Sequence, residues 1–195
     1  MVQHLKMIRG KNITFYLILL FLSCQDNPSY QTIDVKKEIA ELKTHSEKIS
    51  YLEKIYKIDQ DVRDGKSSEL ILKYGIGSPE VLEFYSKMDS IDKLNLERIK
   101  VYLNEFGYPD STYVTREAKI TPWLVIQHST DINKRKEFFP ILYTAYSKGN
   151  IDTDQFEMYL GRTYQMEFGN YPFGEGAYDP KEKINRLIKE LNLIK

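Results

Sequence analysis

The sequence predicts an all-α protein, built as an irregular bundle of about six or seven helices. Apolar residues recur every three or four positions through most of the 195-residue chain, which is the spacing of one helix face. Residues that cap helices stand before several of these segments, and glycines follow them. The short run WLVI at 123–126 could also be a strand, but no partner strand is offered nearby, so we expect a helix there as well.

The first helical pattern extends from residue 32 to residue 63. Its apolar positions include Ile39, Leu42, Ile49 and Leu52. This spacing predicts either one long amphipathic helix or two helices with a break near His45. A short helical piece follows at 69–74 and ends before the glycines of the GIG stretch at 75–77.

The middle of the chain opens with a clear helix start. Ser78 is a suitable N-cap, and Pro79 suits the first turn because its ring fixes a helical φ. We expect this helix to be followed by a second start at Asp89 or Ser90 and to end at Gly107.

The C-terminal half continues with helices separated by short breaks. Thr115 can cap the next one, in which the segment TPWLVIQH at 121–128 carries Pro122 as either a kink or a fresh start. Helices are predicted at 133–148, with a bend at Pro140, at 152–167 and at 181–191. Residues 168–180 hold three glycines, two prolines and four aromatic residues, which predicts a loop whose rings cover the core or form a binding surface.

The N-terminus resembles a bacterial lipoprotein signal. Three basic residues and no acid precede an apolar run, ITFYLILLFL at 13–22, which is too short to cross a bilayer as a helix. Cys24, the single cysteine of the chain, follows after Ser23. The resemblance implies cleavage before Cys24 and lipidation of this residue, with palmitate among the expected lipid groups. An ordinary secretory signal or a short anchor is the alternative.

These features divide the chain into a signal peptide at 1–23, a tether at 24–31 and a single α-helical domain at 32–195. Removing the signal takes away three basic residues, so the formal charge falls from 28 − 28 = 0 to 25 − 28 = −3. A mildly acidic chain has no electrostatic footprint for nucleic acid. We therefore expect a membrane contact through the lipid at Cys24, in the bacterial cell envelope and most simply at the outer membrane, on either of its faces.

Several polar landmarks within the predicted helices resemble those of domain-of-unknown-function family 6624. They are DQDVR at 59–63, Asp92 and Asn95, GYP at 107–109, QH at 127–128 and YLGR at 159–162. The resemblance covers roughly residues 55–175. The chain departs from the family's pattern at Tyr108, where the family has Trp, and at Gly161, where it has Asp. The family offers no activity that could be carried over to this chain, so the resemblance implies candidate site residues and no reaction.

From these residues we expect a binding or interaction module. Five side chains are predicted to converge on one polar pocket for an anionic or amide-bearing small molecule or envelope partner: Gln60, Arg63, Gln127, His128 and Arg162. Arginine would supply paired hydrogen bonds to the ligand, and the Gln-His pair would orient it. The plainer reading is a solvated helix face with ordinary ion pairs, such as Asp59 with Arg63 at i, i+4, and a structural histidine.

A hydrolase is the alternative. In that case His128 would act as general base, with Asp59 or Asp92 as the acid that orients it or binds a metal. The chain has no His-x-x-x-His pair and no second cysteine, so its spacing indicates no metal site and no cofactor. No Gly-x-Ser-x-Gly motif is present to indicate a serine nucleophile.

Overall fold

Helices make up all the regular secondary structure in residues 34–110, 114–174 and 179–194, which are the residues that this computed structural model describes. This confirms the predicted all-α class. The helices are α1 (Val35–Ala40), α2 (His45–Asp61), α3 (Lys66–Tyr74), α4 (Pro79–Phe106), α5 (Arg116–His128), α6 (Ile132–Ser147), α7 (Thr153–Phe168) and α8 (Pro180–Glu190).

The expected signal peptide, the lipidation site at Cys24 and the tether lie outside the described residues. The described residues form one compact unit. Among the helices that the structure describes, none combines the length and the apolar character needed to cross a membrane.

The first helical pattern is divided into two helices, α1 and α2. The break falls at residues 41–44, where Thr44 caps α2. Its hydroxyl accepts a hydrogen bond from the Glu47 backbone N–H, and the Glu47 carboxylate accepts one from the Thr44 N–H in return. This reciprocal capping box satisfies two backbone donors at a helix start. The prediction of two helices with a break near His45 is therefore correct.

Helix α4 extends without interruption from Pro79 to Phe106, so the predicted second start at Asp89 or Ser90 is wrong. Both polar side chains are satisfied within the exposed face of the helix. The Asp89 carboxylate pairs with Lys93 one turn later at 2.6 Å, and the Ser90 hydroxyl donates to the Ser86 carbonyl at 2.9 Å. A capping residue type does not end a helix when its side chain can bond within the same helix.

Helix α5 also continues through its proline. Pro122 lies in the middle of one helix that starts after the Thr115 cap, and WLVI is helical as expected. The Thr121 hydroxyl donates to the Glu117 carbonyl at 2.6 Å and lies 3.2 Å from the Leu52 carbonyl of α2. Pro140 likewise lies inside a single helix, α6.

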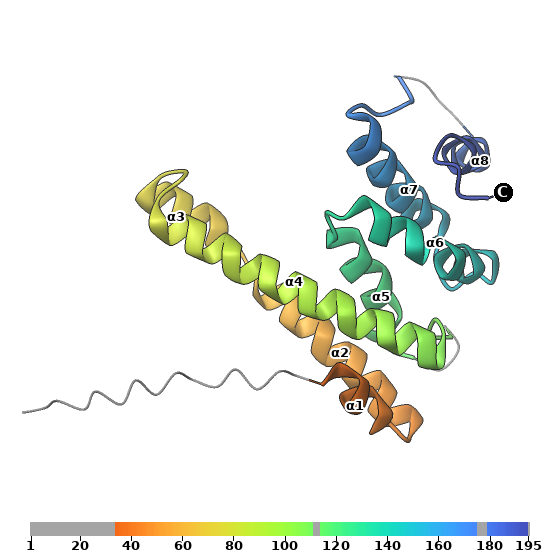
Figure 1. The fold of residues 1–195 in the computed structure, drawn as a ribbon, viewed down its shortest axis with the longest axis horizontal. Helices are drawn as coiled ribbons and strands as arrows, with labels where there is room; N and C mark the ends of the chain where they lie inside the picture. Colours follow the sequence, from red (N-terminus) through yellow and green to blue (C-terminus); the bar gives the residue numbers. More distant parts are fainter. Residues whose placement is uncertain (1–33, 111–113, 175–178, 195) are drawn as a thin grey trace, which may run out of the picture. The chain divides into compact units, whose positions relative to one another are not determined.

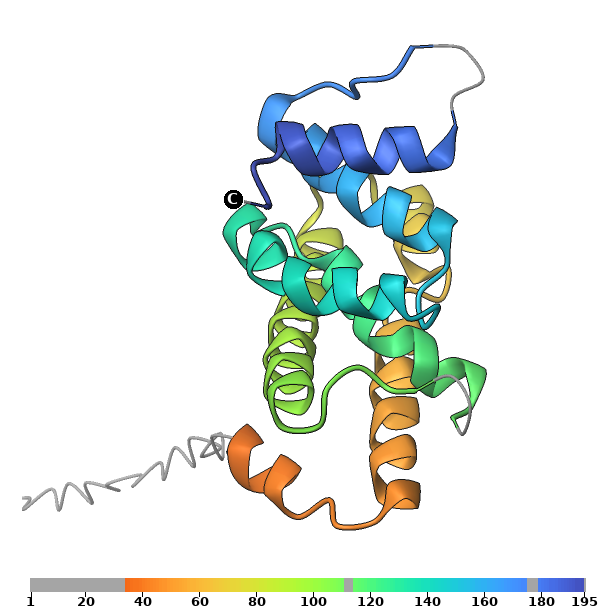
Figure 2. The same cartoon turned by 90° about the vertical axis from the view of Figure 1, so that its right-hand side faces the viewer.

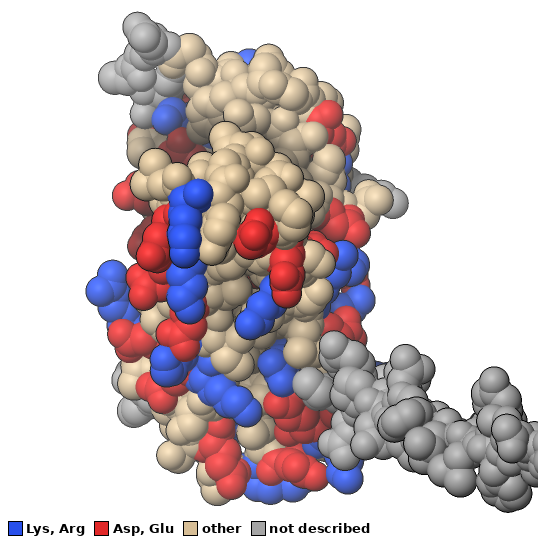
Figure 3. Space-filling view, turned by 90° about the vertical axis from the view of Figure 1, so that its left-hand side faces the viewer, with Lys and Arg blue, Asp and Glu red and all other residues tan. Residues whose placement is uncertain are grey.

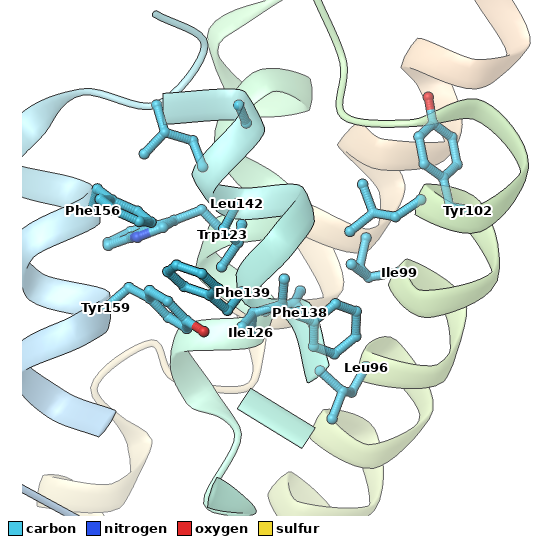
Figure 4. Packing of buried hydrophobic residues seen from close by; sticks show 14 of the residues in the cluster. Leu96, Ile99, Tyr102, Trp123, Ile126, Phe138, Phe139, Leu142, Phe156 and Tyr159 are labelled. Carbon is cyan, nitrogen blue, oxygen red and sulfur yellow. The ribbon is translucent and has the colours of Figure 1, made fainter. Parts of the chain in front are cut away.

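Helix α5 is the central element of the packing. It contacts α2, α4, α6 and α7, while α3 packs on α4 and α8 packs on α7 (Figures 1 and 2). Figure 4 shows Leu96, Ile99 and Tyr102 of α4 on one side of Ile126 and Phe138, and the rings of Phe139, Phe156 and Tyr159 on the other. Burial of these apolar side chains against α5 fixes its position, and with it the position of the residues at its C-terminal end.

Candidate functional site

Asp59 is the buried centre of a cluster of charged side chains. Only 1% of its surface is exposed, although it lies near the end of α2. Its Oδ1 lies 2.8 Å from His128 Nδ1 and accepts a hydrogen bond from Arg63 Nη1 at 3.1 Å. Its Oδ2 accepts from Gln60 Nε2 at 2.9 Å. A buried carboxylate with this many donors is held in one orientation.

Arg63 connects two acidic side chains from different helices. Besides Asp59, it donates from Nη2 to Asp92 Oδ1 of α4 at 2.6 Å, and from Nη1 to the Asp59 backbone carbonyl at 2.9 Å. The ordinary i, i+4 ion pair that the sequence allowed is thus present, but it also extends to a third residue 29 positions away. We call Asp59, Arg63, Asp92 and His128 the Asp59 cluster.

His128 is the last residue of α5, and its imidazole is about one fifth exposed. Because the Asp59 carboxylate can only accept hydrogen bonds, the ring nitrogen that faces it, Nδ1, carries the proton. In the neutral ring Nε2 is then the nitrogen with the free lone pair. The contact with Asp59 fixes both the tautomer and the orientation of the ring.

A cavity of about 450 Å³ lies beside the Asp59 cluster. This volume falls in the range of small-molecule sites. The residues that line it come from the turn after α2, from α4, the end of α5, the α5–α6 connection, α6 and α7: Arg63, Tyr85, Met88, Asp89, Asp92, Lys93, Leu96, His128, Ser129, Thr130, Asp131, Lys134 and Arg162.

The five residues predicted to share one pocket are only partly brought together. Arg63, His128 and Arg162 line the cavity, but Gln60 and Gln127 do not. Gln60 borders a separate surface hollow after α2 and donates to Asp59 from outside. Gln127 is buried and bonds Arg135 on the other side of α5, so it does not share this cavity with His128. Successive helix residues are rotated by about 100°, which separates the two side chains.

Gln127 belongs to a second cluster, which sequence reasoning did not identify. Its Oε1 accepts from Arg135 Nη2 at 2.8 Å, and Arg135 has no exposed surface. Arg135 also donates to Thr163 Oγ1 and to four backbone carbonyls, those of Ile126, Gln127, Ser129 and Tyr159. We call Arg135, Gln127, Tyr159 and Thr163 the Arg135 cluster.

Arg135 holds the C-terminal end of α5, the end that carries His128. The unpaired carbonyls of a helix end are negative, so they stabilise the guanidinium in place of a carboxylate. Burial lowers the pKa of Arg135 to about 10, which leaves it charged at neutral pH. The sequence does contain an indication that Arg135 is buried. Arg135 shares one helix face with Phe138, Phe139 and Leu142 at i+3, i+4 and i+7.

One protein family matches the chain in the comparison with known proteins. The sequence model of the family of unknown function DUF6624 matches residues 51–170. The chain belongs to this family. No curated protein and no solved structure matches it. The matched span of the DUF6624 domain includes both clusters and every residue that lines the cavity.

The two departures from the pattern of the DUF6624 domain have structural counterparts. The Tyr108 hydroxyl donates to the Lys119 carbonyl at 3.0 Å, which ties the turn after α4 to α5. Gly161 lies under the ring of Tyr171, and a Cβ at this position would be 2.7 Å from Tyr171 Cε2. The bare backbone of α7 at Gly161 therefore allows Tyr171 to pack close against the helix.

The DUF6624 domain also has one set of side chains that could hold a metal ion. Within the described residues, one ligand atom each from Asp59, Asp92 and His128 lie within 4.8 Å of one another. The Arg63 guanidinium, however, already bonds both carboxylates and supplies the positive charge between them. A metal ion would have to displace Arg63, so the geometry favours an arginine-organised site.

Proposed function

We propose that the DUF6624 domain binds a small anionic ligand in the cavity beside the Asp59 cluster. The observation that carries this proposal is the charge of the lining. Arg162 and Lys134 border the cavity and form no ion pair with any described residue, whereas Arg63 pairs with Asp92 and Lys93 with Asp89. The remaining acid, Asp131, accepts the Lys134 backbone N–H at the start of α6. Two cations are therefore available to an anion.

The Asp59 cluster would position the polar wall of this site. Arg63 is engaged by two carboxylates, so Arg162 is the guanidinium that can offer paired hydrogen bonds to the ligand. His128 would present Nε2 beside it, because Nδ1 is occupied by Asp59. Asp59 then acts through His128 and Arg63 as a positioning residue.

Binding can be tested with inorganic phosphate and acetate as probes. The full chain would be titrated with each anion, and amide chemical shifts would be followed by NMR. We expect Ser129, Thr130 and Asp131 to respond in the wild type and not in Arg162→Gln. Arg116→Gln removes one exposed arginine from the start of α5, away from the cavity, and should bind like the wild type. Equal binding by wild type and Arg162→Gln would contradict the proposal.

Hydrolysis is the second candidate function, and the Asp59–His128 contact favours it. His128 Nε2 would accept a proton from a water molecule as the water oxygen bonds to an acyl or phosphoryl centre. The bond from that centre to its leaving group breaks, and the imidazolium returns the proton to the leaving group. Asp59 stabilises the imidazolium while it exists, as in other Asp-His pairs.

This reaction can be tested with p-nitrophenyl acetate, butyrate and phosphate. If His128 is a general base, His128→Ala should lower the hydrolysis rate by about 10²–10⁴-fold while phosphate still binds. Asp61→Asn changes an exposed carboxylate outside the cavity and serves as control. Hydrolysis that is absent in the wild type, or equal in His128→Ala, would leave the domain as a binding module. Elemental analysis of the purified protein would reveal a bound metal.

We further propose that the domain is carried as a lipid-anchored protein of the bacterial cell envelope. The charged start, the apolar run at 13–22 and Cys24 support this. Growth with labelled palmitate should label the wild type and not Cys24→Ser. Labelling that persists in Cys24→Ser would contradict a lipid anchor at this residue.

A further inference from the structure

We propose that the ligand of this cavity is amphiphilic, with an anionic head group and a short apolar chain that lies along α4. This inference rests on the proposed anion site and specifies its ligand class. It is carried by the difference between the two walls of the cavity.

One wall is apolar and comes from a single helix. Tyr85, Met88 and Leu96 of α4 line the cavity, and their spacing places them with Asp92 on one side of the helix. Asp89 and Lys93 at the margin of this side pair with each other at 2.6 Å. Their charges therefore balance and do not compete for a ligand.

The facing wall is polar and comes from other helices. It consists of His128 at the end of α5, the connection 129–131, Lys134 of α6 and Arg162 of α7. A ligand that is anionic throughout would leave Tyr85 and Met88 against polar groups. An apolar ligand would leave the two available cations desolvated without a partner. An anion with an apolar chain is complementary to both walls.

The apolar wall continues out of the cavity along α4. Tyr85 is 39% exposed, and Leu82, three residues earlier on the same side, is 59% exposed. Leu72 of α3 and Ile76 in the α3–α4 connection are both 88% exposed. Figure 3 shows uncharged side chains gathered on the face at the α3 end of these helices, with charged residues around them. Exposed apolar side chains near a cavity are a feature of ligand-binding sites.

The volume of the cavity limits the length of the ligand's apolar chain that fits inside. A cavity of about 450 Å³ has room for on the order of 15 water-sized groups, at about 30 Å³ each. This is sufficient for a carboxylate or phosphate head group and about six to eight carbon atoms. Longer chains would extend past Tyr85 toward Leu82.

The test is a series of probes with increasing alkyl length, and their binding to the full 195-residue protein is measured by calorimetry. The probes are acetate, hexanoate, octanoate, octyl phosphate and hexylammonium. Each added methylene should lower the dissociation constant about fourfold, so octanoate, with two more methylenes, should bind roughly sixteenfold more tightly than hexanoate. Hexylammonium should not bind, because Arg162 and Lys134 repel a cation. Octyl phosphate compared with octanoate identifies the preferred head group.

Two matched methionine variants test where the apolar chain of the ligand binds. Met88→Gln should remove the gain from added methylenes and leave acetate binding unchanged. Met158→Gln replaces an exposed methionine of α7 that lies outside the cavity, and should keep the gain. If octanoate binds no more tightly than acetate while acetate binding still requires Arg162, the amphiphile proposal fails and the anion site stands. If octanoate binds equally well to Arg162→Gln, or no probe binds, the proposed function itself is overturned.

Discussion

Two arginine clusters lie on opposite sides of the C-terminal end of α5. Each cluster contains one of two adjacent residues at this end of the helix. Gln127 joins the Arg135 cluster, and His128 joins the Asp59 cluster. Arg135 is completely buried, and its partners in the described residues are neutral oxygen atoms. The Arg63 side chain is 23% exposed and bonds two carboxylates beside a cavity.

The difference teaches what each guanidinium can do. A buried arginine that bonds several carbonyls cannot be reached by a ligand, and its removal leaves those carbonyls without partners. A partly exposed arginine between two acids holds side chains at the edge of a cavity, where they remain accessible. We therefore assign the Arg135 cluster to the fold and propose a functional role for the Asp59 cluster.

Among the substitutions considered, Arg135→Met is expected to have the largest effect, which is a loss of stability. Loss of the guanidinium leaves the end of α5 and the Gln127 and Thr163 side chains without their donor, which should cost about 3–5 kcal/mol of unfolding free energy. Urea unfolding measures it. Lys136→Met removes the next residue's surface pair with Glu167 and should cost less than about 1 kcal/mol. Similar costs for both variants would contradict the structural assignment of Arg135.

A smaller loss of stability is expected from Asp59→Asn. Arg63 keeps Asp92 and the Asp59 backbone carbonyl as partners, so the cost should be about 1–3 kcal/mol. Phosphate binding should weaken by a larger factor than in Asp61→Asn, which breaks only an exposed pair with Lys57. A stability cost above that of Arg135→Met, measured by the same urea titration, would reverse the assignment of the two clusters.

Alkaline pH should act on the Arg135 cluster through Tyr159. Burial raises the pKa of this phenol, whose hydroxyl donates to the Arg135 carbonyl at 2.6 Å. The folded protein keeps the proton above pH 10, whereas the unfolded chain loses it, so stability from this group is complete below pH 10 and declines as the pH rises. At pH 11 the loss should be about 1.4 kcal/mol.

Comparison of wild type with Tyr159→Phe isolates this contribution. The difference in unfolding free energy between pH 8 and pH 11 should be about 1.4 kcal/mol smaller in the variant. Tyr143→Phe changes a partly exposed tyrosine of α6 and should show the wild-type difference. An unchanged difference in Tyr159→Phe would show that this phenol does not couple to folding.

The smallest effect is expected at Gly161, beside Arg162. Alanine favours a helix over glycine by about 1 kcal/mol, but its Cβ would require Tyr171 to move. Gly161→Ala alone should therefore change stability little. In a Tyr171→Ala background the same substitution should stabilise by about 1 kcal/mol, measured by thermal unfolding. Stabilisation of equal size in both backgrounds would show that Tyr171 does not constrain α7.

The sequence alone was sufficient for the fold class and for most helix ends. The caps Ser78 and Thr115, and the stop at Gly107, are where the local residues predicted them, because these bonds form within one turn. Whether a helix is interrupted at Asp89, Pro122 or Pro140 could not be decided from the neighbouring residues in the sequence. Each of these residues fits both a helix end and an uninterrupted helix, and packing against neighbouring helices selects between them.

For the candidate site, the residue types Asp59, Arg63, Asp92, His128 and Arg162 were recognisable from the sequence. Which of them meet was decided by the tertiary structure, since Asp59 and His128 are 69 positions apart and are joined by the packing of α2 against α5. The tertiary structure also separated Gln127 from His128. Only the burial of one side of α5 against Arg135 determines which of two adjacent polar side chains supports the fold and which reaches the cavity.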